Sequence, residues 1–79
     1  MTFAALLTLC TIGAACQDYQ IGIEPNRASC ESRIALEEPA AIAAWNGSDD
    51  ELSRYLAQYN ISADVYVLSD IGLSCKVIK

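Results

Sequence analysis

The most apolar stretch of the chain is its beginning, where residues 1–17 carry no charged side chain. A strand over this stretch would be apolar on both faces, with Leu7 and Leu9 on one side and Leu6 on the other. Strands that are apolar on both faces occupy central, covered positions in a sheet. The pattern therefore predicts a buried core element, and a buried helix is the alternative.

The same stretch also fits an export signal, because small residues 13–15 precede Cys16 and the sequence there resembles a bacterial lipoprotein acceptor site. Two features depart from that pattern. Residues 1–7 contain no Lys or Arg, and Gly13 stands three places before Cys16, where a leucine or similar residue is usual. A transmembrane helix is a separate possibility, and the run is shorter than the roughly 20 residues that it needs.

We therefore expect one compact domain over residues 1–79, located in the cytoplasm of a bacterial host. The alternative is a signal peptide over residues 1–15, with a mature periplasmic or outer-membrane lipoprotein over residues 16–79.

The expected redox state of the cysteines depends on the compartment. They stand at positions 10, 16, 30 and 75, and the chain has no histidine. This spacing lacks the Cys-x-x-Cys units of zinc and redox sites, so we expect no metal and no cofactor. In a cytoplasmic protein the thiols would be small buried hydrophobes. In an exported one, we expect a disulfide between Cys30 and Cys75.

The middle of the chain alternates between strand and helix patterns. Residues 18–24 alternate as a short half-buried strand. Residues 28–38 fit either element, and we favour a helix at their start. Pro39 is expected to end it, and residues 40–45 then form a short second helix.

The second half gives the clearest signals. Ser48 and Glu51 form a capping box that predicts a helix over about residues 49–60, with an apolar stripe at helical spacing. The β-rich runs 64–69 and 73–78 predict a C-terminal hairpin. Together the patterns predict an α+β domain, with an antiparallel sheet of three to four strands and two or three helices on one face.

Charge narrows the possible partners. Ten acidic residues against five basic ones give a net charge of −5, which argues against direct binding to nucleic acid. A protein with a basic surface is the partner that this charge favours. Helix capping and solubility are the competing structural explanation of the same acidic residues. The candidate contact residues are Glu37, Glu38, Trp45, Asp49, Asp50 and Glu51.

Catalysis has few candidate groups. A serine or cysteine nucleophile would lack a histidine base, and the four glycines are too scattered for a phosphate-binding loop. We therefore expect a binding protein rather than an enzyme, and the oligomeric state is left open.

In size and charge the chain resembles the compact inhibitors that phages and mobile elements use against host defence, such as anti-CRISPR proteins. No sequence motif carries this resemblance. It implies an inhibitor that occludes a basic nucleic-acid-binding surface of its target. The alternative function is an exported or lipid-anchored envelope protein stapled by Cys30–Cys75.

Overall fold

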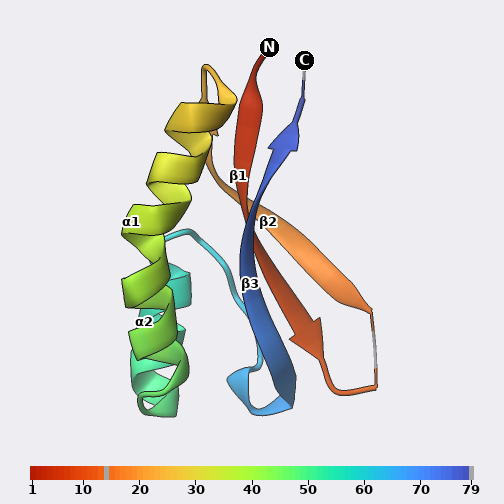
Figure 1. Cartoon of the computed structure of the whole chain (residues 1–79). Coiled ribbons are helices and arrows are strands. Elements are labelled where there is room, and N and C mark those ends of the chain that lie inside the picture. Colours follow the sequence, from red (N-terminus) through yellow and green to blue (C-terminus); the bar gives the residue numbers. More distant parts are fainter. Residues whose placement is uncertain (14, 79) are drawn as a thin grey trace.

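The computed structural model describes residues 1–13 and 15–78. It has the predicted α+β class, with a three-stranded antiparallel sheet and both helices on the same side of it (Figure 1). The elements in chain order are β1 (Phe3–Thr11), β2 (Cys16–Glu24), α1 (Arg27–Trp45), α2 (Asp49–Ala57), the short 3-10 turn η1 (Val65–Val67) and β3 (Leu68–Val77).

The apolar first segment is the central strand of the sheet, as its pattern predicts. The strand order is β2-β1-β3, so β1 is hydrogen-bonded on both edges. Phe3, Ala5, Leu7 and Leu9 are buried in the core beneath the helices. Ala14, which belongs to the small-residue run of the export interpretation, lies outside the described residues.

β2 is the predicted second strand, and it carries an irregularity. The β1–β2 register shifts between Ala5 and Leu6, which leaves Ile21 as an extra residue on β2. Ile21 is buried in the core. A bulge of this kind bends the strand and increases its twist.

The predicted break at Pro39 is wrong, because α1 runs through this residue as one helix of 19 residues. A proline cannot donate to the carbonyl four positions earlier, here that of Ala35. Both residues are exposed, so water can satisfy the free carbonyl. The helix therefore tolerates a proline that a buried face would not.

Continuity of α1 also fixes which of its residues face the sheet. The buried positions are Cys30, Ala41 and Ala44, which keep a single helical phase along the whole element. Ile42, which follows Ala41, is 51% exposed. The small buried side chains let the helix approach the sheet closely.

α2 forms as predicted at its start. The Ser48 hydroxyl accepts a hydrogen bond from the Glu51 amide, and Leu52, Tyr55 and Leu56 form the buried stripe. The helix ends at Ala57, three residues earlier than the sequence predicts.

The end of α2 explains this difference. Asn60 adopts a left-handed conformation with φ of 60°, and the Ile61 amide donates to the Leu56 carbonyl at 3.1 Å. Asparagine is one of the few residues that tolerate this backbone conformation at a helix end.

The predicted C-terminal hairpin is wrong, since residues 68–77 form a single strand, β3. Gly72 lies inside the β1–β3 ladder opposite Thr8 and makes no turn. The long apolar β1 offers a partner along the whole length of β3, which outweighs the local turn signal. Val65–Val67 forms η1 instead, and the Asp64 carboxylate accepts from the Tyr66 amide there.

All four cysteines are in disulfides, Cys10–Cys16 and Cys30–Cys75. The reduced thiols expected for a cytoplasmic chain are therefore not what the structure shows, and the Cys30–Cys75 bond of the alternative interpretation is present. Cys10–Cys16 joins paired positions of β1 and β2. Cys30–Cys75 ties the start of α1 to β3 across the core.

We predict that the two disulfides contribute unequally to stability. Cys30–Cys75 spans 45 residues and Cys10–Cys16 only 6. Because a longer closed loop removes more entropy from the unfolded chain, we expect Cys30–Cys75 to stabilise the fold by about 4 kcal/mol and Cys10–Cys16 by about 2 kcal/mol. Urea unfolding of Cys30→Ala/Cys75→Ala and of Cys10→Ala/Cys16→Ala measures both free energies. An equal or reversed order would contradict this prediction.

Candidate functional site

The predicted contact residues fall into two groups that the structure does not bring together. Asp49, Asp50 and Glu51 form the first turn of α2, whereas Glu37 and Glu38 lie in the middle of α1. Glu37 contacts Tyr59, which follows the far end of α2. The two groups are therefore separated by about the length of α2, roughly 14 Å.

The first group forms a corner between the two helices, which we call the acidic corner: Trp45, Asp49, Asp50 and Glu51. Its three carboxylates are exposed and lie at the positive end of the α2 dipole, which stabilises them. In the part of the chain that the structure describes, the single salt bridge is between Arg33 and Glu24. None of the corner carboxylates is in a salt bridge there, although Arg54 follows one turn later on α2.

Trp45 has a partly structural role. It is the last residue of α1, and its half-buried side chain packs against the core. It directly precedes the exposed residues Asn46 and Gly47. Only the exposed part of the indole is open to a partner.

Glu37 is engaged inside the molecule. Its half-buried carboxylate accepts a hydrogen bond from the Tyr59 hydroxyl at 2.5 Å, which ties α1 to the segment after α2. The Tyr59 ring packs edge-on against Tyr55 with centroids 5.7 Å apart. The sequence offers no signal for this pairing, because 22 residues separate the two partners.

The surroundings of this pair change the titration of the tyrosines. Burial raises the pKa of Tyr59 well above its ordinary value, and the hydrogen bond to the Glu37 carboxylate raises it further. Burial and the negative charge of Glu37 likewise raise the pKa of Tyr55. Both phenols are therefore held in their neutral form.

Glu38 lies at the rim of a groove between α1 and β3, with a volume of about 250 Å³. We call it the α1–β3 groove. The residues that line it are Glu38, Ala41, Ile42, Ile71, Gly72 and Leu73. Glu38 is exposed, and the other lining residues are apolar, so the groove combines a hydrophobic floor with one carboxylate.

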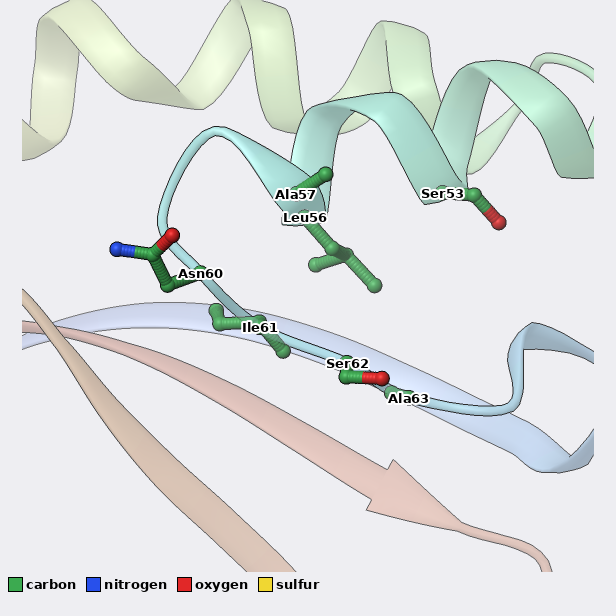
Figure 2. A pocket seen from close by; sticks show the side chains of 7 residues that line it. All are labelled: Ser53, Leu56, Ala57, Asn60, Ile61, Ser62 and Ala63. Carbon is green, nitrogen blue, oxygen red and sulfur yellow. The ribbon is translucent and has the colours of Figure 1, made fainter.

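A larger open cavity of about 440 Å³ lies below α2. Figure 2 shows Leu56 extending from α2 above the loop that carries Asn60, Ile61, Ser62 and Ala63. None of the residues that line the cavity has an ionisable side chain. The cavity therefore has no group for general acid–base chemistry.

Arg33 is the most engaged polar residue that the sequence patterns do not single out. Its guanidinium donates to the Ile21 carbonyl at 3.0 Å and approaches the Glu24 carboxylate at 3.6 Å. The side chain also lies over Gly22, where a Cβ atom would collide with it. Arg33 thus fastens α1 to β2, and Gly22 leaves room for that contact.

Within the described residues, no cluster of three or more histidine, cysteine or acidic side chains is arranged to hold a metal ion. No helix among those residues is long and apolar enough to span a membrane. No protein-family model matches the chain, and comparisons with curated proteins and with solved structures find no match either. The function must therefore be inferred from the surface and its chemistry.

We predict that the protein loses stability as the pH rises above 10. The folded state retains the Tyr59 proton after the unfolded chain, with its ordinary pKa of 10.0, has begun to lose it, so the free energy of unfolding falls with rising pH. Urea unfolding between about pH 9.5 and 11 measures this slope.

Tyr59→Phe should flatten the slope, leaving the smaller contribution of Tyr55. Tyr66→Phe is the matched control, because Tyr66 is 76% exposed, and it should keep the slope of the unsubstituted protein. Equal slopes in all three proteins would refute the assignment.

Proposed function

We propose that this chain is a binding protein without catalytic activity, and that its acidic corner engages a basic surface of a partner protein. The observation that supports the proposal is the group of exposed carboxylates of Asp49, Asp50 and Glu51, close in sequence to a half-buried Trp45. None of these carboxylates is in a salt bridge within the described residues. Such a surface increases the association rate with a basic partner. An aromatic residue at its centre supplies the apolar contact on which interface affinity depends.

The net charge of −5 supports the same proposal. Helix capping accounts for part of the acidic group, since Ser48 caps Glu51. It does not account for Glu38, which is exposed on α1, far from a helix end. The proposed mode of action is occlusion. Where the basic surface of the partner binds nucleic acid, the bound chain keeps the nucleic acid from that surface and so acts as an inhibitor.

The two disulfides favour a second candidate, an exported envelope protein. Disulfides persist in oxidising compartments and are rare in the cytoplasm. A lipid anchor on Cys16 fits less well, because its sulfur is bonded to Cys10. Cleavage before Cys16 would also remove β1, which pairs with both other strands.

Charge reversal tests the first candidate. A partner is first isolated by co-purification, and its Kd is then measured for the unsubstituted chain, Asp50→Lys and Glu31→Lys. Both substitutions change the net charge equally, but Glu31 is exposed near the start of α1, remote from the acidic corner. We expect Asp50→Lys to raise the Kd about tenfold, and Glu31→Lys to leave it within about twofold.

Equal losses in the two variants would mean that only the total charge matters. No loss in Asp50→Lys would mean that the partner binds elsewhere. Either result removes the acidic corner from the proposal.

Thiol trapping in producing cells separates the two compartments. Cells are quenched with an alkylating reagent, and the intact mass of the chain reports how many thiols were free. A fully oxidised, unalkylated chain is expected for the exported protein. Four alkylated cysteines would place the chain in a reducing compartment and contradict the second candidate.

A further inference from the structure

The outer edge of β3 is free in the described chain. The strand order β2-β1-β3 leaves β3 paired on one side only. Strands of this length with a free edge are templates for pairing with another chain. β3 is 10 residues long, contains no proline and has an unbroken register with β1 from Val77 to Asp70.

The hydrogen-bond pattern shows which residues of β3 face outward. The Ile78 amide donates to the Thr2 carbonyl at 2.8 Å, and hydrogen-bonded pairs alternate along an antiparallel ladder. The unbroken register therefore directs the backbone groups of Asp70, Gly72, Ser74 and Lys76 toward β1. Those of the intervening residues point to the free edge: Ile71, Leu73, Cys75 and Val77.

One of these outward amides confirms the assignment. The Ile71 amide donates to the side chain of the preceding residue, Asp70, at 2.8 Å. An amide used in the β1 ladder would not be available for this bond.

The opposite edge of the sheet differs. β2 has its bulge at Ile21, within the strand, whereas the register shift of β3 lies at Ser69, before residues 70–77. The Ile21 carbonyl is occupied by Arg33. The Glu24 carboxylate is paired with the same guanidinium. Bulges and edge charges are devices that prevent strands from pairing, so the two edges of this sheet are not equivalent.

The sequence of β3 is self-complementary in charge. Asp70 and Lys76 are its two charged residues, both are exposed, and they stand three positions to either side of Leu73. In an antiparallel pair of β3 strands centred on Leu73, each Asp70 lies directly opposite a Lys76 of the partner. Opposite charges at facing positions stabilise a strand pair, and like charges destabilise it.

The same register satisfies the backbone. Centring on Leu73 places outward-facing residues opposite one another, with Leu73 facing its own copy and Ile71 facing Cys75 of the other chain. These become hydrogen-bonded pairs, and the Ile71 amide exchanges its bond to the Asp70 carboxylate for one to the Cys75 carbonyl of the other chain. Asp70 and Lys76 meet at a non-hydrogen-bonded position, where side chains are closest. A register shifted by one residue would lose both the backbone bonds and the charge pairs.

Side chains beside the edge agree with this arrangement. Gly72 faces Ser74 of the second chain, and no atom lies within 4 Å of the position of a Cβ on Gly72, so the open face of the sheet has no bulky obstacle. On the helix side, the apolar α1–β3 groove with its half-exposed Ile42 would be covered. Glu38 at the rim can keep its carboxylate in water.

We propose that two copies of this chain pair through β3 in the antiparallel register centred on Leu73, forming one continuous six-stranded sheet. The pairing is independent of the acidic corner, which belongs to the helical layer.

The test measures mass against concentration by sedimentation for four samples. They are the unsubstituted chain, Asp70→Lys, Lys76→Asp, and an equimolar mixture of these two variants. Each variant alone replaces two attractive pairs with two repulsive ones, so its dimer Kd should rise about ten- to thirtyfold. In the mixture every Lys again faces an Asp, and the heterodimer should form with about the affinity of the original.

Asp70→Asn is the matched control, because it keeps an acceptor for the Ile71 amide but removes the charge. It should weaken the dimer less than Asp70→Lys does. Far-ultraviolet circular dichroism confirms that each variant is folded, and recovery of the dimer in the mixture shows the same independently.

Amide hydrogen exchange supplies a second readout that depends on the register. In dilute, monomeric protein the amides of Leu73 and Cys75 should exchange faster than those of Ser74 and Lys76. At concentrations where the dimer forms, the two classes should become equally protected.

A chain that stays monomeric at millimolar concentration would overturn the proposal, and so would a dimer that is indifferent to the charge of residues 70 and 76. Edge amides that become protected only when a different protein is added would assign the edge to a foreign strand and also overturn it.

Discussion

The structure depends on the pairing of β1 with both of its neighbours. The strands β2 and β3 are hydrogen-bonded to β1 and not to each other, and the side chains of β1 supply much of the buried core. An uncharged segment can take this position because it is covered by helices on one face and flanked by strands on both edges. Its lack of charge, which also makes it similar to an export signal, is what a central strand requires.

The helical layer is held in place by small side chains that face the sheet and by long-range contacts of α1. Cys30, Ala41 and Ala44 bring α1 close to the sheet, and the disulfide to Cys75 fixes its start against β3. The Glu37–Tyr59 hydrogen bond fixes the other half of α1 against the segment that follows α2. Pro39 follows both of these positions along α1 and is exposed, so the helix continues through it.

The sequence predicted those elements whose local pattern and tertiary role agree. β1 is apolar throughout, β2 alternates, and α2 has a cap and a stripe, so each could be recognised without knowledge of its partners. The predicted break at Pro39 and the predicted hairpin around Gly72 were wrong for a common reason. In both places the local sequence signal is overridden by tertiary contacts with β1 and the core, which a local pattern does not contain.

The candidate site was less predictable than the fold. The exposure of Asp49, Asp50 and Glu51 follows from their place in the first turn of an amphipathic helix, which the sequence shows. The separation of Glu37 and Glu38 from that turn follows from the length of α2 and from the way it folds back on α1. The internal use of Glu37 and the partly buried Trp45 are consequences of packing, which composition and spacing do not encode.

The pattern of ties also explains how the sheet can keep one open edge. β2 is bent by its bulge and covered by Arg33, so its outer backbone groups are poorly placed for a further strand. β3 is held by the β1 ladder on one side and by a covalent bond to α1 through its helix-facing side chains. These contacts leave the outer backbone groups of β3 unused except for the Ile71 amide, which donates to the Asp70 carboxylate. β3 can therefore stay ordered while its edge is free. An ordered edge loses little conformational entropy when a second strand binds, so rigidity of this kind favours association.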